Sequence, residues 1–512
     1  MSFMKSFFLL LTLQSYILLS SCSWTPGDTS SSASKQAGLS STLSEHTDIL
    51  FMMYLDGDNN LHDYAWENLI NAQKALSNLS SDFKITVLAL IDGNSQYANK
   101  YQKDGKSYLL TLRGYSAAEL KNTSLPALAA ATIDHSKTEK WIYNGTGTGS
   151  QEIDMSAGNT LHNFLRWSKA NYKADKTIFI IQNHGGGPYI ESFTSISNRA
   201  LCWDETTGTK RYLSNNDIAN AISWTFGKVD LLVEDVCSEG AIELIYGLQD
   251  IADYIIASPN ITRTCSYNYD KIISYAASTS SIPDIGKKLI DYNKETVENE
   301  NLKKPQIKDN DSACTEFSLT LIDCSKKSTL LNIKNHTSQL AAAILADTDS
   351  MKAFYRQNRI GKLKKNTADN FYGFSYETKY FYTQDLGLLA YMLGYKTEGA
   401  SEDVTNAARN LYDDFKNGGL IAYGWAGGKE NSWYYSGNSS YGSDNENSSF
   451  LKISDGKCPW GISITCDYLI YNDTSGKKYI YQIDDYGSWT TFATGNRWAD
   501  LLKTYWREVT GK

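Results

Sequence analysis

Two segments of this 512-residue chain decide its fold: Thr177–Gly187 (TIFIIQNHGGG) and Val229–Gly240 (VDLLVEDVCSEG). Each begins with a short apolar run, which is typical of a buried strand. Each run then gives way to polar and glycine residues, which include His184 in the first segment and Cys237 in the second. The carboxyl ends of parallel strands lie at one edge of an open sheet, so we expect His184 and Cys237 to be neighbours there.

Strand and helix patterns alternate around these two segments. The alternation predicts an α/β fold with a mostly parallel sheet flanked by helices. A less regular second half predicts a mixed α+β subdomain packed on that sheet. In the first half of the chain, the other predicted strands are Ile49–Leu55, Phe83–Ile91 and Tyr254–Ala257. The predicted helices there are Leu61–Leu79, Ser214–Thr225, Gly240–Gln249 and one that is capped by Asn159 or Thr160. The stretch Tyr97–Leu112 has a hairpin pattern.

The N-terminus has the pattern of an export signal. Lys5 precedes the apolar run Phe7–Leu19, which is too short to span a membrane comfortably, and Leu-Ser-Ser-Cys follows, ending at Cys22. This pattern predicts a lipoprotein signal peptide over 1–21, a lipid on Cys22 and a flexible tether over 22–47. The protein would then be extracytoplasmic, anchored by lipid at a bacterial cell surface or in the periplasm. The alternative is an ordinary signal peptide that ends near a cysteine.

The residues at the predicted sheet edge suit a thiol nucleophile. Such a group attacks a carbonyl as the thiolate and needs a base beside it. Among the six histidines, only His184 directly follows a strongly apolar strand. The amide of Gly185 could bind a developing oxyanion, and a helix starting near Gly240 would favour a thiolate at Cys237. The pattern predicts peptide-bond cleavage; the alternative is that Cys237 is an inert, buried side chain.

Composition narrows the function classes. The net charge is -8 and the 49 basic residues are dispersed among 57 acidic ones, which argues against a nucleic-acid partner. Six of the eight cysteines remain for disulfides once Cys22 and Cys237 are set aside, and no spacing indicates a zinc site. The aromatic content leaves open a catalytically inactive surface lipoprotein that binds glycan or protein. A carboxylate-based glycosidase is a weaker alternative, because no carboxylate pair stands out.

Several motifs resemble the clostripain family of cysteine peptidases, which are relatives of caspases, legumains and gingipains. They are Phe51–Leu61 (FMMYLDGDNNL), Ile85–Gly93, Thr160–Gly187, Leu201–Asp204 (LCWD), Glu234–Leu248 (EDVCSEGAIELIYGL) and Ala252–Ser258, with weaker echoes at Gln384–Leu389 (QDLGLL) and Gly461–Ile464 (GISI). The resemblance implies a caspase-like catalytic domain over 48–280, a C-terminal subdomain over 281–512, and protein or peptide substrates. It makes His184 the base and acid, Cys237 the nucleophile, and the amides of Gly185 and Cys237 the oxyanion hole.

The resemblance also implies cleavage after Arg or Lys. Asp235 matches an acidic residue of the family's first specificity pocket, although it could instead cap the helix near Gly240. Family members often cut themselves between the histidine and the cysteine, where this chain offers Arg199 and Arg211. The sequence departs from the family pattern around the nucleophile and after the glycine run, at Val236, Ser238, Glu239, Pro188 and Tyr189.

The predicted dyad requires no cofactor, and the sequence assigns no metal ligands. Some relatives use calcium. Asp56, Asp58, Asn60 and Glu67 occupy positions 1, 3, 5 and 12 of an EF-hand-like run. However, Leu61 stands where such a loop needs glycine, and a helix is predicted to begin there. The sequence therefore argues against calcium in this run and leaves calcium elsewhere open.

Overall fold

The computed structural model of the chain describes residues 44–79, 84–112, 115–122, 125, 152–189, 201–206, 212–259, 262, 267–303, 316–352, 354, 375–377, 382–428, 431–436, 439–444, 460–466, 470–472, 478–480 and 486–510. The predicted signal peptide over 1–21 lies outside these residues, as do Cys22, Arg199 and Arg211. The first strand begins at Glu45, within the last residues of the predicted tether.

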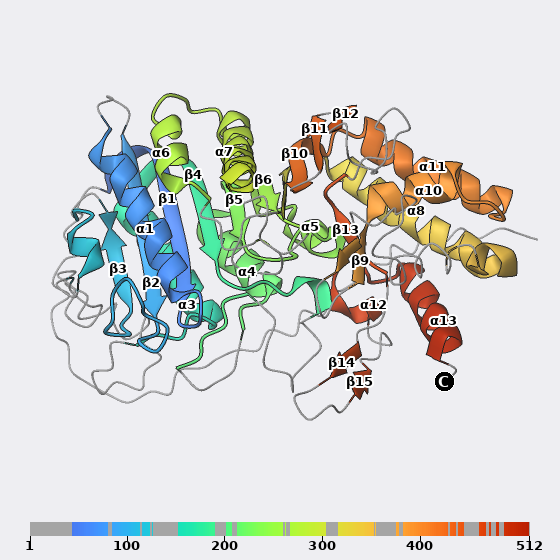
Figure 1. Cartoon of the computed structure of the whole chain (residues 1–512), viewed down its shortest axis with the longest axis horizontal. Coiled ribbons are helices and arrows are strands. Elements are labelled where there is room, and N and C mark those ends of the chain that lie inside the picture. The colour runs from blue at the N-terminus through green and yellow to red at the C-terminus, as the bar shows by residue number, and fades with distance from the viewer. Residues whose placement is uncertain are drawn as a thin grey trace, which may run out of the picture. The chain divides into compact units, whose positions relative to one another are not determined.

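A mostly parallel sheet is confirmed at the centre of the fold. Within the described residues its strands are β1 (Glu45–Gly57), β2 (Ile85–Gly93), β3 (Tyr108–Thr111), β4 (Tyr172–Gln182), β5 (Val229–Asp235), β6 (Ala252–Ala257), β7 (Glu316–Asp323), β10 (Ile421–Gly428), β11 (Asn431–Ser436) and β12 (Ser439–Asp444). Their order is β12-β11-β10-β7-β6-β5-β4-β1-β2-β3 (Figure 1). The strands β6, β5, β4, β1 and β2 pair in parallel, whereas the strands on both flanks pair antiparallel.

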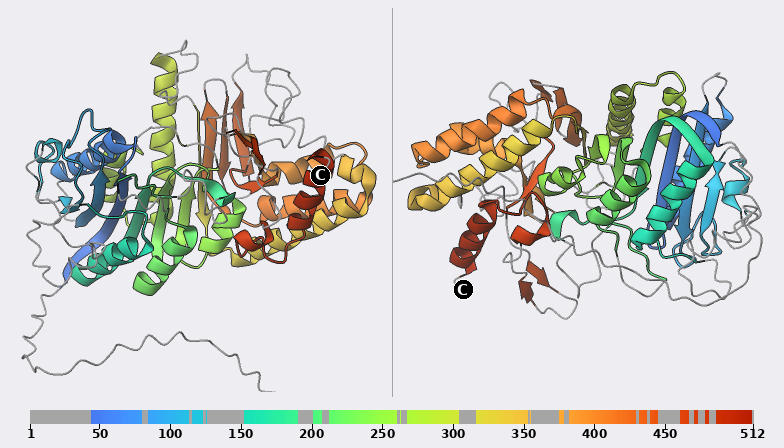
Figure 2. Two further views of the ribbon diagram at one scale, coloured as in Figure 1. Left: turned by 90° about the horizontal axis from the view of Figure 1, so that it is seen from below. Right: turned by 180° about the vertical axis from the view of Figure 1, so that it is seen from behind.

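Helices cover both faces of this sheet, which explains why the central strands are apolar on both sides. One face carries α1 (His62–Ser77), α6 (Tyr269–Ala276) and α7 (Ile282–Lys303); the other carries α3 (Gly158–Asn171), α4 (Asn215–Phe226) and α5 (Ile242–Leu248) (Figures 1 and 2). Each face of the sheet packs into its own hydrophobic core. Along β1, Phe51 and Met53 belong to the core on the α1 face, and Met52 and Tyr54 belong to the core on the α3 face. Alternate residues of a strand point to opposite faces, so one strand serves both cores.

The C-terminal half extends the sheet and adds helices beside it. Strands β7, β10, β11 and β12 come from the predicted subdomain over 281–512, yet they belong to the sheet of the predicted catalytic domain. The remaining elements are α8 (Lys327–Ala346), α10 (Leu386–Tyr395), α11 (Glu402–Asn417), α12 (Tyr486–Trp489), α13 (Trp498–Thr510), a small sheet of β8 (Ser375–Glu377), β9 (Tyr382–Asp385) and β13 (Ser463–Thr465), the pair β14 (Ile470–Asn472) and β15 (Lys478–Ile480), and the 3-10 turns Glu119–Lys121 and Gly187–Tyr189. No helix within the described residues is long and apolar enough to span a membrane.

The two weak C-terminal motifs meet beside the segment that follows Cys237. Asp385 of the first motif accepts hydrogen bonds from the backbone amides of Trp460, at 2.8 Å, and Gly461, at 2.7 Å. Ser463 of the second motif donates its backbone N–H to the carbonyl O of Gly240, at 2.9 Å. The C-terminal half therefore supports the loop on which the predicted nucleophile lies.

Two local predictions are wrong. The hairpin expected over Tyr97–Leu112 does not form, because only β3 is a strand there and it pairs with β2. The helix expected to be capped by Asn159 or Thr160 already begins at Gly158, so neither residue is its cap.

Candidate active site

The register of β4 against β5 brings the two predicted catalytic segments to the same edge of the sheet. Gln182, the last residue of β4, pairs with Asp235, the last residue of β5. His184 and Cys237 each lie two residues beyond this pair. The chain segments that carry them therefore leave the sheet side by side.

Gly185 lies directly against the backbone of Cys237. A Cβ atom on Gly185 would be 2.1 Å from the carbonyl O of Cys237 and 2.8 Å from its N. Atoms cannot approach so closely, so a side chain at this position would force the two segments apart. The N–H of Gly185 also hydrogen-bonds to the Cys237 thiol. The first glycine of the run thus gives the backbone access to the sulfur, as such a site requires.

His184 is held by a residue that follows β1. Its Nε2 lies 2.7 Å from Oδ1 of Asn60. The amide oxygen can only accept, so Nε2 carries the proton and Nδ1 is the basic nitrogen. The side chain of Asn183 accepts the backbone N–H of His184 and donates to the carbonyl O of Asp56, at 2.7 Å. The sequence places Asn60 only in a calcium-loop position and does not reveal this contact.

Cys237 is partly exposed, and its sulfur contacts Thr262. The Sγ lies 3.5 Å from both the carbonyl O and the hydroxyl Oγ1 of Thr262. Burial raises the pKa of the Cys237 thiol, and the hydrogen bonds from Thr262 and Gly185 lower the pKa against that effect. The resting residue is therefore a thiol that needs a base before it can attack.

The helix predicted over Gly240–Gln249 forms, but it begins two residues later than predicted. The helix α5 begins at Ile242 with Ala241 as its N-cap, and the N–H of Gly240 donates to the carbonyl O of Ser258, at 2.7 Å. Cys237 therefore does not lie in the first turn of this helix, where the helix dipole would favour a thiolate.

Asp235 is buried and lies two residues before Cys237 in the sequence. Its Oδ2 accepts hydrogen bonds from the Tyr269 hydroxyl, at 3.0 Å, and from the Asn68 side chain, at 3.3 Å. Burial raises the pKa of Asp235 to about 7, although both hydrogen bonds lower it. Its charge in turn raises the pKa of Cys237. The alternative role as a helix cap is wrong, because the carboxylate binds Tyr269 and Asn68 and α5 begins farther on.

Comparison with known proteins adds an independent observation. A family model described as the clostripain family matches residues 53–506. The chain belongs to the clostripain family. This is a family of cysteine endopeptidases that act on proteins and peptides, which agrees with the enzyme class predicted from the sequence.

Individual relatives are more distant. Clostripain from Hathewaya histolytica is 26% identical over 288 residues, which are 52% of this chain and 50% of that protein. The chain thus matches about half the length of this curated relative. A secreted C11 cysteine protease from Bacteroides thetaiotaomicron, solved with an irreversible peptide inhibitor, has 14% identity and a TM-score of 0.47, with 88% of this chain and 99% of that chain covered. An inactive zymogen C11 protease from Parabacteroides distasonis has 15% identity and a TM-score of 0.43, with 82% of this chain and 92% of that chain covered.

Glu239, where this chain departs from the usual clostripain pattern, connects the nucleophile loop to the glycine run. Its Oε1 accepts the amides of Gly186, at 3.2 Å, and Gly187, at 3.0 Å. Both amides are thereby hydrogen-bonded to Glu239. The amide of Gly185, the first of the three glycines, instead hydrogen-bonds to the Cys237 thiol. Burial raises the pKa of Glu234, and the nearby charge of Glu239 raises it further. The departure therefore has a structural role that the sequence did not reveal.

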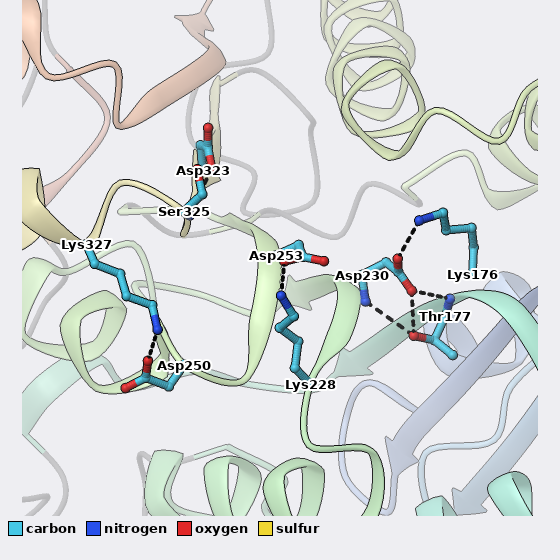
Figure 3. Close-up of polar contacts among 9 residues, drawn as sticks. All are labelled: Lys176, Thr177, Lys228, Asp230, Asp250, Asp253, Asp323, Ser325 and Lys327. Atoms are coloured by element: carbon cyan, nitrogen blue, oxygen red, sulfur yellow. Dashed lines mark hydrogen bonds and ion pairs between the residues drawn. The ribbon is translucent and has the colours of Figure 1, made fainter.

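The opposite edge of the sheet carries a different kind of polar network (Figure 3). There Asp230 accepts from the Lys176 ammonium and the Thr177 amide, both at 2.9 Å. Asp253 pairs with Lys228 in the same region. Lys176, Asp230 and Asp253 line a pocket of about 350 Å³. Each of these carboxylates has a lysine partner, so the network explains how the amino ends of the strands are held and supplies no nucleophile.

Among the described residues, two groups of side chains could hold a metal ion. One oxygen each of Asp58, Asp92, Glu152 and Asp204 lies within 4.8 Å of the others, and Asp58, Asp92 and Asp204 are buried. The second group, His46, Asp48 and Asp175, is exposed or half-buried. The described cysteines Cys202, Cys237, Cys324 and Cys466 carry free thiols.

Removing the Thr262 hydroxyl should slow the reaction of Cys237 with alkylating agents. In Thr262→Val the thiolate loses a hydrogen bond worth about 1.5 kcal/mol, so alkylation by iodoacetamide at neutral pH should be roughly tenfold slower. The pH profile of alkylation should also move to higher pH. Peptide mass spectrometry follows Cys237 separately from the other thiols. Thr262→Ser keeps the hydroxyl and should match the parent; a Val variant with the parent's profile would show that this contact does not stabilise the thiolate.

Proposed function

We propose that this protein is a cysteine endopeptidase in which Cys237 and His184 form the catalytic dyad. Membership of the clostripain family supports the reaction class. The observation that carries the proposal for these residues is the contact of Gly185 with the Cys237 backbone, beside the exit of His184 from the neighbouring strand.

The reaction follows from the roles of the atoms at this edge. His184 takes the thiol proton on Nδ1, while Nε2–H remains bonded to Asn60. The thiolate of Cys237 attacks the peptide carbonyl carbon, and the amides of Gly185 and Cys237 bind the oxyanion. His184 then protonates the leaving amine as the C–N bond breaks, which leaves a thioester. Water, deprotonated by His184, attacks the thioester and releases the acid and the free thiol.

We also propose that Asp235 selects substrates with Arg or Lys before the cleaved bond. A buried carboxylate that pairs with a guanidinium gives strong, directional selection. The carboxylate lies close enough to Cys237 to affect the pKa of its thiol, and it has amide and hydroxyl donors but no ion pair among the described residues. Because the pKa of Asp235 is about 7, the ionised form that attracts a cation gains population as the pH rises through 7.

Reporter peptides test the reaction and the specificity together. The parent should cleave after Arg or Lys and Cys237→Ala should not. In Asp235→Asn, kcat/KM for an Arg peptide should fall roughly 100-fold, equivalent to about 3 kcal/mol, because a charged hydrogen bond is lost. An Asn peptide should lose far less. In the parent, the preference for Arg over Asn peptides should weaken as the pH falls below 7.

Two outcomes contradict these proposals separately. If Cys237→Ala cleaves as fast as the parent, the thiol mechanism is wrong. If Asp235→Asn retains the parent's preference for Arg, the pocket assignment is wrong and the dyad is unaffected. No cleavage of any peptide by the parent would instead favour the alternative of an inactive surface lipoprotein that binds glycan or protein.

We further propose that the protein is an extracytoplasmic lipoprotein, anchored through Cys22, that cuts itself after Arg199 or Arg211. The lipobox-like run ending at Cys22 supports the anchor, and the basic residues between His184 and Cys237 support the self-cleavage. All three of these residues lie outside the described part of the chain.

Mass spectrometry of detergent-extracted protein tests both features in one measurement. The parent should yield two fragments cut after Arg199 or Arg211, and its N-terminal peptide should begin at Cys22 and carry acyl chains. Cys237→Ala should yield an uncut chain with the same lipid, since only the cleavage depends on the thiol. Fragments identical in the two proteins would rule out self-cleavage, and an unmodified N-terminal cysteine would rule out the anchor.

A further inference from the structure

The nucleophile loop (237–240) and the glycine run (185–187) lie against each other along more than the contact at Gly185. A Cβ atom on Gly187 would be 3.1 Å from the carbonyl O of Ser238. Both residues have left-handed backbone, with φ of 66° at Gly187 and 63° at Ser238. A residue with a side chain rarely adopts such a conformation, and it persists where the surrounding contacts hold it. The structure therefore needs an interaction that fixes these two segments.

The side chain of Glu239 supplies that interaction. It is only 2% exposed, and its Oε1 accepts the backbone N–H groups of Gly186, at 3.2 Å, and Gly187, at 3.0 Å. Its Oε2 accepts the side-chain N–H of Asn215, the first residue of α4, at 3.1 Å. One carboxylate group thus joins the nucleophile loop, the glycine run and the start of a helix on the sheet.

The nucleophile loop has a rigid frame of its own, whereas the glycine run is free to rotate. At the end of the loop, Gly240 donates its N–H to the carbonyl O of Ser258, at 2.7 Å, and accepts the N–H of Ser463, at 2.9 Å. A Cβ atom on Gly240 would be 2.5 Å from the N of Pro259, so the backbone is closely packed there. Three consecutive glycines, by contrast, can adopt many backbone conformations. The direction of their N–H groups therefore depends on the acceptors that hold them.

A second buried glutamate shows which carboxyl group carries the charge. Glu234 has no exposed surface, and neither of its side-chain oxygens has a hydrogen-bond partner among the described residues. Burial, and then the charge of Glu239, raise the pKa of Glu234 well above its ordinary value, so Glu234 is uncharged at neutral pH. Glu239 has three N–H donors, which stabilise a carboxylate. Glu239 is therefore the ionised acceptor that the glycine run requires.

We propose that Glu239 is a positioning residue of the oxyanion hole, an inference that rests on the proposed function. By holding the amides of Gly186 and Gly187, the carboxylate keeps the preceding amide of Gly185 directed at the reacting atoms. Asn215 holds the carboxylate in turn from α4. Hydrogen-bond donors stabilise a developing oxyanion most when they are in place before the reaction begins. Glu239 should therefore affect the chemical step, through Gly185, and leave the affinity for substrate unchanged.

Peptide kinetics of two Glu239 variants test the proposal. Glu239→Met keeps the length of the side chain and loses both oxygens, so kcat should fall roughly 100-fold, as on loss of an oxyanion donor, while KM changes little. Glu239→Gln keeps one oxygen for the two glycine amides. Its new NH₂ group faces Asn215, whose Oδ1 has no hydrogen-bond partner and can accept once the amide turns over. The glutamine variant should therefore keep most of the parent's kcat.

Asn215 allows a rescue experiment, which also serves if Glu239→Met does not fold. In Asn215→Asp two carboxylates face each other, so kcat should fall. Adding Glu239→Gln restores a donor and an acceptor, and kcat should rise roughly tenfold above that of Asn215→Asp alone. The control is Glu243→Met, the same substitution at a buried glutamate that accepts from the Thr465 amide and the Tyr486 hydroxyl. Its folded form should keep the parent's kcat, and circular dichroism establishes which variants are folded.

Alkylation of Cys237 by iodoacetamide tests the positioning without any assay of cleavage. The hydrogen bond from the Gly185 amide lowers the pKa of the Cys237 thiol, so its loss should raise that pKa. The pH profile of alkylation should therefore move to higher pH in Glu239→Met and stay at the parent's position in Glu239→Gln. If this shift is seen and the parent cleaves no peptide, the proposed function is wrong and the positioning of Gly185 by Glu239 stands.

Four results would overturn the inference. They are a folded Glu239→Met protein with the parent's kcat and alkylation profile, a rise in KM with kcat unchanged, a glutamine variant as impaired as the methionine variant, and a double variant no more active than Asn215→Asp. The first two would show that Glu239 does not act through the Gly185 amide. The third would show that the charge matters and the acceptor position does not, and the fourth would show that α4 does not hold the carboxylate.

Discussion

The close approach of Gly185 to the backbone of Cys237 is the contact on which the candidate active site depends. It requires a residue without a side chain, and it requires β4 and β5 to end level with each other at Gln182 and Asp235. A shift of one residue in this register would turn the side chains of one strand to the opposite face of the sheet. The apolar layers on both faces of the sheet oppose such a shift, so the packing of the core fixes the position of the sulfur.

The two edges of the sheet neutralise their acidic residues in different ways. At the amino edge lysines pair with Asp230 and Asp253. At the carboxyl edge Asp235 and Asp92 are buried and form no ion pair with a described lysine, and burial raises the pKa of both carboxyl groups. A buried carboxyl group with no cation of its own is a natural receptor for a cation from outside. In our account the side chain of the substrate supplies this cation at Asp235.

Much of the central sheet was predictable because its strands are buried on both faces and read as continuous apolar runs. The same pattern predicted that the segments of His184 and Cys237 end at one edge. The contacts of Asn60 and Thr262 were not predictable, because each polar side chain meets a partner brought close only by the fold. The partner of Asn60, for example, lies 124 residues away in the sequence. The four-carboxylate cluster was missed for the same reason, since its members come from four separate segments.

The error at the start of α5 has a specific cause. Gly240 follows a strand and precedes an apolar run, which is typical of a helix start, but its amide and carbonyl instead bond to Ser258 and to Ser463 from the C-terminal half. A local pattern cannot reveal a partner so distant in the sequence. In our proposal the activation of Cys237 therefore comes from His184, Thr262 and the amide of Gly185 rather than from a helix dipole.

The most direct test of the account is the site and rate of labelling by an arginine-directed, thiol-reactive peptide inhibitor. Mass spectrometry should find the label on Cys237 alone, and His184→Ala should reduce the labelling rate by at least 100-fold, as general-base catalysis predicts. Labelling of another cysteine, or an equal rate in a folded His184→Ala protein, would contradict the claim that these two residues act together.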